Sequence, residues 1–198
     1  MAQPTENKYL GKTIRSKEGP RHVCGRGQFT DDFTLPGMLH GIVLRSTYPH
    51  ARILDVDTQA ALEVPGVVAV VTPELVKQRS HPFKPGRYAA GLKTPVPEYA
   101  TAIDRVRYLG EPIAMLAARS PSIAEDALEL IRVEYDPLPT VVDPWKAMES
   151  SAPLLFEELG SNVAWKGAVS YGDVEEAFRS ADQVVREKLK THRYSSTP

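Results

Sequence analysis

Histidine, cysteine and paired aspartates are the residues of this 198-residue chain that could bind a metal or act as nucleophiles. No two histidines have the i,i+4 spacing that would place both imidazoles on one helix face, and HExxH is absent. Asp31 and Asp32 lie among glycines and a proline, where aspartate is favoured because its carboxylate bonds the local backbone. We therefore interpret the histidines as surface or turn residues and the aspartates as turn residues. The histidines are His22, His40, His50, His81 and His192.

The single cysteine, Cys24, limits the redox and metal chemistry of the chain. One thiol cannot form an internal disulfide, hold an iron–sulfur cluster or build a cysteine-based zinc site. No neighbour that would activate it can be inferred, so an inert thiol is favoured over a reactive one. The absence of disulfide pairs and the polar N-terminus, which lacks a signal-peptide core, lead us to expect a cytoplasmic protein.

Two short motifs could suggest a cofactor or nucleophile site. "GRG" at 25–27 falls short of a dinucleotide fingerprint, which needs a strand before it and a helix after it. "SYGD" at 170–173 lacks the GxSxG pattern of a nucleophile elbow. Neither motif predicts a site.

The range 79–104 is irregular and rich in proline, and the overlapping stretch 76–87 carries four Lys or Arg residues and His81. A solvated loop is one interpretation, and a docking surface or a funnel for an anionic substrate is another. Long loops inside compact domains are often functional. A binding module with its own ligand at 79–104 is thus an alternative for the whole chain.

The turn "YLGEP" at 108–112 joins two strand-like stretches, and we expect Gly110 to need a positive φ there. Glu111 is open to two interpretations. It is either a buried carboxylate that accepts backbone N–H groups across a domain seam or a plain turn residue. Taken together, the residues predict no catalytic, cofactor-binding or metal-ligating side chain in this chain.

Charge and hydropathy argue against two classes of partner. Lys plus Arg is 24 and Asp plus Glu is 25, so the formal net charge is −1 and provides no attraction to nucleic acid or anionic lipid. The longest apolar runs, 67–71 and 113–118, are far shorter than the roughly 20 residues of a membrane span. We expect neither a nucleic-acid nor a membrane partner.

Strand and helix patterns alternate irregularly up to residue 139. The range 51–57 alternates apolar and polar residues, which is typical of a half-buried strand. Asp57 and Ser120 are the predicted N-caps of two helices, the second with Pro121 in its first turn. The mixed order with short turns predicts an α+β fold rather than a doubly wound sheet. Predicted strands are 39–46, 51–57, 67–72, 106–108, 113–118 and 131–139, and predicted helices are 58–64, 73–78 and 121–131.

A new pattern follows residue 140. Asp143 is predicted to begin a short helix around Trp145. The ranges 162–172 and 183–194 resemble strands, and between them Asp173 and Glu176 form the capping box of a predicted helix over 173–182.

Three long stretches, 37–72, 106–139 and 172–185, resemble the N-terminal region of molybdenum-hydroxylase large subunits. This family includes xanthine dehydrogenase, aldehyde oxidase and aerobic carbon monoxide dehydrogenase. The resemblance implies an N-terminal arm over 1–19 and an α/β hammerhead domain with a mixed sheet over 20–140. A linker over 141–160 and a truncated β-α-β start of the molybdopterin-binding domain over 161–198 would follow.

The resemblance also implies a reaction and partners. A molybdenum centre on a pterin dithiolene oxidises a small molecule with water-derived oxygen, and electrons pass to Fe-S clusters and FAD on partner subunits or domains. Placing the clusters on partner subunits or domains agrees with the single cysteine of this chain, because one cysteine cannot hold an Fe-S cluster. The family's pterin-binding loops and catalytic residues have no counterpart within 1–198, so we expect this chain to be inactive alone. Its partners would be the Fe-S and FAD subunits and the rest of the large subunit, in a hetero-oligomer whose substrate the sequence does not specify. The alternative is a separately encoded hammerhead subunit that docks onto a catalytic chain.

Overall fold

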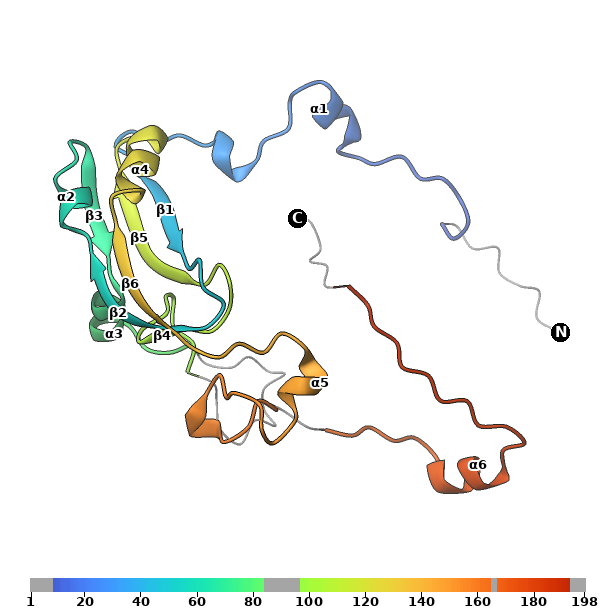
Figure 1. Ribbon diagram of the computed structural model, residues 1–198. Coiled ribbons are helices and arrows are strands. Elements are labelled where there is room, and N and C mark those ends of the chain that lie inside the picture. Colours follow the sequence, from blue (N-terminus) through green and yellow to red (C-terminus); the bar gives the residue numbers. More distant parts are fainter. Residues whose placement is uncertain (1–8, 84–96, 165–166, 193–198) are drawn as a thin grey trace. The chain divides into compact units, whose positions relative to one another are not determined.

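The computed structural model describes residues 9–83, 97–164 and 167–192. The chain forms two compact units (Figure 1). The first unit comprises Met1–Phe83 and Glu98–Thr140, and the second comprises Lys84–Pro97 and Val141–Pro198. Each unit is described below on its own.

One three-stranded sheet of the first unit has the order β1-β5-β3. Its strands are β1 (His40–Arg45), β5 (Pro112–Ala118) and β3 (Val67–Val71), and both pairings are antiparallel. The central strand β5 is apolar along its length and largely buried, because a central strand has neighbours on both edges and packing on both faces. The predicted buried strand at 113–118 is confirmed.

The second sheet has the order β4-β2-β6. It contains β4 (Arg105–Val106), β2 (Ala51–Asp57) and β6 (Arg132–Pro137), again paired antiparallel. The α+β class is therefore confirmed, whereas the expected mixed sheet is replaced by two antiparallel sheets.

The predicted alternation along β2 is wrong at its centre. The register against β6 shifts between Ile53 and Asp55. A bulge adds one residue to the strand, so Ile53 and Val56 are both half-buried while Leu54 is 57% exposed. A strict period of two would have placed Leu54 and Val56 on the same face.

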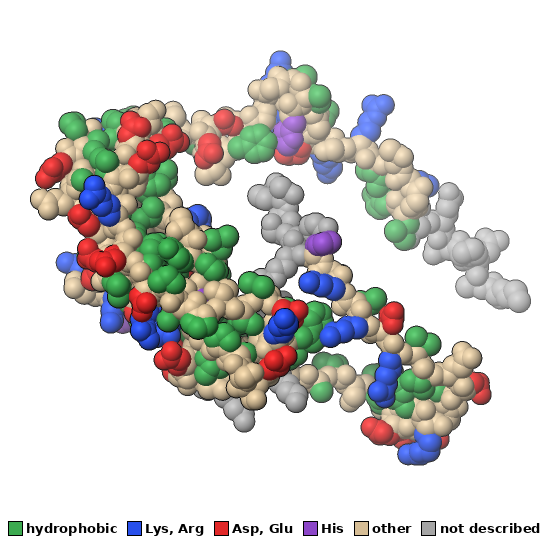
Figure 2. Space-filling model, viewed as in Figure 1, with side chains coloured by type: hydrophobic (Ala, Val, Ile, Leu, Met, Phe, Trp, Pro, Cys, Tyr) green, Lys and Arg blue, Asp and Glu red, His purple; other side chains and the backbone are tan. Residues whose placement is uncertain are grey.

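Helix α4 (Pro121–Leu128) covers the first sheet, lying against β1 and β5. Ser120 caps it as predicted, accepting the N–H of Ile123 on its Oγ at 3.3 Å. Ala124 and Ala127 are buried against Leu116 of β5, and their small side chains let the helix approach closely. The opposite side of α4 is acidic and exposed, as Figure 2 shows for the face around α2 and α4.

The first unit contains two further short helices. Helix α3 (Pro73–Arg79) is capped by Thr72, whose Oγ1 accepts the N–H of Leu75 at 3.4 Å. Helix α2 (Gln59–Leu62) has Thr58 at its N-cap position rather than the predicted Asp57. Asp57 still contributes, because its Oδ1 accepts the N–H of Gln59 at 3.0 Å from one position earlier.

Strand β5 takes part in both hydrophobic cores of the first unit. Leu116 belongs to the core beneath α4. Ile113, fully buried, packs with Ala51 and Val106 in the core of the second sheet. One strand therefore fixes the two sheets relative to each other through its own side chains.

The N-terminal part of the described chain contains α1 (Gly19–Val23) and a 3-10 turn, η1 (Thr30–Asp32), neither with a buried residue. Asp32 accepts the N–H of Phe29 at 2.8 Å, so its carboxylate serves the turn as predicted. His22 lies with its ring 5.6 Å from that of Phe29.

The second unit begins with α5 (Pro144–Ala147), which Asp143 caps as predicted by accepting the N–H of Trp145 at 2.8 Å. A short turn, η3 (Glu157–Leu159), follows. The Asn162 side chain then joins three stretches of backbone. It accepts the N–H of Leu155 at 3.0 Å and donates to the carbonyl oxygens of Ala147 and Pro153 at 3.1 and 2.9 Å.

Helix α6 (Val174–Ser180) forms where predicted, with Asp173 accepting the N–H of Glu176 at 2.9 Å. The Glu176 carboxylate pairs with Arg179 instead of completing the capping box. The predicted strands at 162–172 and 183–194 are wrong wherever the structure describes those ranges, because no strand occurs there. Tyr171 and Val185 are almost fully exposed, and a strand needs a neighbour to pair its backbone groups.

Candidate functional site

The most constrained polar feature of the first unit is the turn at 107–111, packed against the corner that follows β1. Ser46 donates its backbone N–H to the carbonyl of Glu111 at 2.9 Å and accepts the N–H of Gly110 at 2.9 Å. The guanidinium of Arg45 donates to the carbonyl of Gly110 at 3.0 Å. Gly110 has φ +83°, which confirms the predicted left-handed position.

Glu111 lies partly buried inside this turn. Its Oε2 accepts the backbone N–H of Arg107. Burial raises the pKa of the Glu111 carboxyl, while the hydrogen bond and the charge of Arg107 act in the opposite direction. Of the two interpretations, the structure supports a carboxylate that binds backbone N–H groups, but within its own turn rather than across a domain seam.

Three tyrosines surround the corner. The rings of Tyr48 and Tyr135 lie 4.9 Å apart at 45°, and burial raises the pKa of the Tyr135 phenol against the opposing effect of hydrogen bonding to Ser46. Partial burial, with the nearby Glu111 carboxylate, also raises the pKa of Tyr108. Raised pKa values keep the phenols of Tyr108 and Tyr135 protonated at neutral pH, so these two groups act as hydrogen-bonding groups and not as bases.

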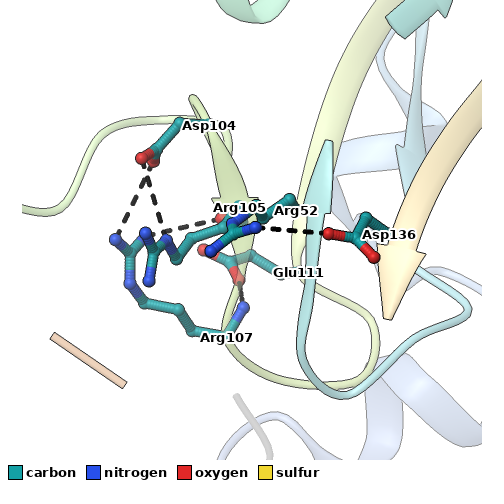
Figure 3. Close-up of polar contacts among 6 residues, drawn as sticks. All are labelled: Arg52, Asp104, Arg105, Arg107, Glu111 and Asp136. Carbon is teal, nitrogen blue, oxygen red and sulfur yellow. Dashed lines mark hydrogen bonds and ion pairs between the residues drawn. The ribbon is translucent and has the colours of Figure 1, made fainter. Parts of the chain in front are cut away.

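Charged residues surround the same turn and the neighbouring sheet (Figure 3). Asp104 lies 3.8 Å from the Nε of Arg105 and 3.9 Å from an Nη of Arg107. On the second sheet, Arg52 of β2 pairs with Asp136 of β6 at 3.3 Å. Each ion pair has at least one strongly exposed member, so the pairs orient side chains but contribute little stability.

This arrangement can hold a turn in place, but it offers no reacting group. The Glu111 oxygen is used by the backbone of its own turn, and the Ser46 hydroxyl is used by Tyr48, whose N–H and carbonyl it bonds at 3.0 and 2.7 Å. Among the described residues there is no group of three His, Cys, Asp or Glu that could hold a metal. These residues do not fit a metal centre. That the chain has no catalytic, cofactor-binding or metal-ligating residue stays a prediction.

Other residues considered from the sequence lie apart from this turn. Cys24 is exposed in the N-terminal part of the chain. His81 and His192 are exposed. Lys84 and Arg87 of the basic stretch lie in 84–96, the half of 79–104 that is outside the described residues. In the ranges that are described, no helix has the length and apolarity to cross a bilayer.

Sequence reasoning missed His50. Its side chain is 4% exposed, and its Nδ1 lies 2.7 Å from the carbonyl oxygen of Pro139. The available signal was its position, directly before the strand 51–57. A polar residue there lies at the edge of a core and needs a partner.

The sequence matches the family profile "Aldehyde oxidase and xanthine dehydrogenase, a/b hammerhead domain" over residues 24–139. The chain is 35% identical to the nicotine 6-hydroxylase large subunit of Paenarthrobacter nicotinovorans, over 98% of this chain and 24% of that protein. It is 33% identical to the nicotinate dehydrogenase large molybdopterin subunit of Eubacterium barkeri, over 93% of this chain and 41% of that protein.

Solved structures give the same result for the fold. Quinoline 2-oxidoreductase from Pseudomonas putida 86 superposes with a TM-score of 0.73 at 34% identity, over 89% of this chain and 22% of that one. The chain spans about a quarter of the length of the first curated relatives that it matches.

Proposed function

The chain belongs to the aldehyde oxidase and xanthine dehydrogenase family, and from that premise we propose that it forms the hammerhead part of the large, molybdopterin-binding subunit of a molybdenum hydroxylase. The observation that carries the proposal is the match over 24–139, which covers both sheets of the first unit. In this proposal residues 20–140 are the hammerhead domain, 141–160 a linker and 161–198 the first elements of the molybdopterin-binding domain.

The role that we assign to these residues is structural. The molybdenum cofactor of such an enzyme supplies oxidation with oxygen derived from water, and we assign its binding to other polypeptide of the enzyme. The turn at 107–111 uses its polar groups internally, which supports this assignment. A single cysteine cannot ligate an Fe-S cluster, which supports placing the clusters on other subunits or domains.

We assign electron transfer to Fe-S and FAD partners, which makes the native assembly a hetero-oligomer acting on a small molecule. Names of relatives such as "large subunit" and "large molybdopterin subunit" support an assembly of several chains. The single cysteine, which cannot form an internal disulfide, supports a cytoplasmic location.

The test compares the native assembly with residues 1–198 produced alone. An antibody against this chain should isolate from its source a complex that contains molybdenum, iron and flavin. That complex should reduce a dye with an aldehyde, an N-heterocycle or carbon monoxide as substrate. Residues 1–198 alone should contain no stoichiometric molybdenum and reduce no dye.

The two arms fail in different ways. A native complex without molybdenum would reject the proposed enzyme class. Stoichiometric molybdenum on the isolated chain would instead reject the assignment of cofactor binding to parts of the enzyme other than residues 1–198.

A further inference from the structure

Three connecting segments of the first unit meet where β2 begins. Residues 46–50 lead from β1 into β2, residues 107–111 lead from β4 into β5, and residues 138–140 leave β6 at the end of the unit. Ala51, the fully buried first residue of β2, is paired with Val106 on one side and Pro137 on the other. The residue before Ala51 is His50, which is therefore next to the point where the chain leaves the unit.

His50 bonds the departing segment twice. Its backbone carbonyl accepts the N–H of Leu138 at 3.0 Å. Its ring Nδ1 lies 2.7 Å from the carbonyl oxygen of Pro139. A carbonyl oxygen only accepts hydrogen bonds, so Nδ1 carries the proton and donates it to Pro139.

The sequence of the departing segment makes these two bonds unusually important. Pro137 and Pro139 have no backbone N–H, so Leu138 provides the only amide donor of 137–139. That donor is used by His50, and the carbonyl of Pro139 is held by the same residue. His50 thus binds both the last amide donor before Thr140 and the carbonyl that follows it.

The other ring nitrogen of His50 shows that packing alone does not explain the imidazole. Nε2 is buried and has no hydrogen-bond partner among the described residues. A buried acceptor without a partner is unfavourable, so a site that required only bulk would favour an apolar side chain. The Nδ1 donor provides the reason for a histidine.

We propose that His50 is a positioning residue that fixes the direction in which the chain leaves the first unit at 138–140. The corner that carries it is itself held, because Ser46 is bonded to Gly110 and Glu111. In the enzyme, which rests on the proposed function, these bonds would hold the segment through which the chain leaves the hammerhead domain.

The first test needs no substitution. In residues 1–198, the ¹⁵N shifts of the His50 ring should show that Nδ1 carries a proton. A ring protonated on Nε2 alone would overturn the proposal, because Nδ1 would then have no proton to donate to Pro139.

The second test uses a matched pair of variants. The amide of Asn occupies nearly the place of Nδ1, whereas the amide of Gln reaches the place of Nε2. We expect His50→Asn to leave the hydrogen exchange of the Leu138 amide within about threefold of wild type, and His50→Gln to accelerate it about tenfold or more. The amide of Leu116 in β5 reports global stability and should change equally little in both variants.

Two outcomes contradict the proposal. If the Leu138 amide exchanges in His50→Gln at the same rate as in wild type, the ring of His50 does not hold the segment 138–140. Equal acceleration at Leu138 and Leu116 in both variants would show that His50 matters for packing alone. Neither measurement depends on molybdenum. A failure of the His50 proposal can therefore be distinguished from a failure of the proposed function.

The native complex provides a further measurement. Turnover per bound molybdenum should fall in His50→Gln and recover in His50→Asn. Recovery by Asn is not expected of a residue whose only role is to fill space, so loss in both variants would count against positioning.

Discussion

The backbone N–H of Ser46 donates to the carbonyl of Glu111 at 2.9 Å, which joins the end of β1 to the residue that precedes β5. The same corner accepts the N–H of Gly110. Both segments pass from one sheet to the other, so these bonds hold two connections side by side. The Glu111 carboxylate then closes the turn from within, and its charge state should affect how well the turn is held.

Glu111→Gln should flatten the pH dependence of stability. Burial raises the pKa of Glu111 above its ordinary value of 4.5, so the folded state binds the proton more tightly than the unfolded state. Its contribution to stability is therefore greatest at low pH and falls as pH rises from 4.5 through the raised folded-state value. Glutamine keeps an acceptor for Arg107 without ionising. The measurement is urea unfolding between about pH 4 and 8. At neutral pH the variant should equal or exceed the wild type in free energy of unfolding. The gain should be about 1 kcal/mol or less, because solvent screens the half-buried group.

Glu111→Ala is the control for that experiment. It removes the acceptor as well as the charge, so it should be less stable than Glu111→Gln by about 1 kcal/mol at every pH. A Gln variant that keeps the wild-type pH slope would show that another group is responsible.

Local patterns of the sequence were sufficient to place most elements of the first unit. Ser120 followed by Pro121 identifies the start of α4, and the unbroken apolar run at 113–118 identifies β5, because both signals depend on neighbours in sequence. The division of the strands into two antiparallel sheets depends on pairing between distant segments, which no local pattern records. The bulge in β2 was missed for the same reason, since it appears only against the register of β6.

The polar groups show the same limit. The turn at Gly110 was predicted because its conformation is a local property. His50 was missed because its partners, Leu138 and Pro139, are remote in sequence. The strand pattern at 183–192 shows the converse, since β-forming residues form no strand there without a neighbouring strand.

Gly66→Ala should destabilise the first unit more than Gly110→Ala. Both glycines have a positive φ, which costs an alanine about 1–2 kcal/mol. A Cβ on Gly66 would also lie 2.8 Å from Cδ1 of Ile123 on α4, whereas a Cβ on Gly110 would meet no atom within 4 Å. Thermal unfolding should show an additional loss of about 1 kcal/mol for Gly66→Ala.

Ile123→Val separates the two causes, because it removes the atom that clashes. In a double-mutant cycle, Gly66→Ala should cost less in the Ile123→Val background, and the remaining cost should approach that of Gly110→Ala. If Gly66→Ala costs the same stability in both backgrounds, the whole effect comes from the backbone conformation and none from the clash with Ile123.

Ile53→Ala should be much more costly than Leu54→Ala. Ile53 lies two residues after the buried Ala51 and packs against the core formed with Val106 and Ile113, while Leu54 faces solvent. We expect about 2 kcal/mol for Ile53→Ala and about 0.5 kcal/mol for Leu54→Ala, measured by urea unfolding. The reverse order would show that Leu54, and not Ile53, packs into this core in solution.

Backbone amides over 183–192 should exchange at least about a hundredfold faster than those of Leu116 and its neighbours in β5. β5 is bonded on both edges, whereas the described residues of 183–192 form no strand and leave Val185 and Leu189 strongly exposed. Hydrogen exchange with mass spectrometry on residues 1–198 measures both regions at once. Equal protection would mean that the segment pairs with another strand, either from its own chain or from a second copy. Dilution separates these cases, because pairing between copies weakens with dilution whereas pairing within a chain does not.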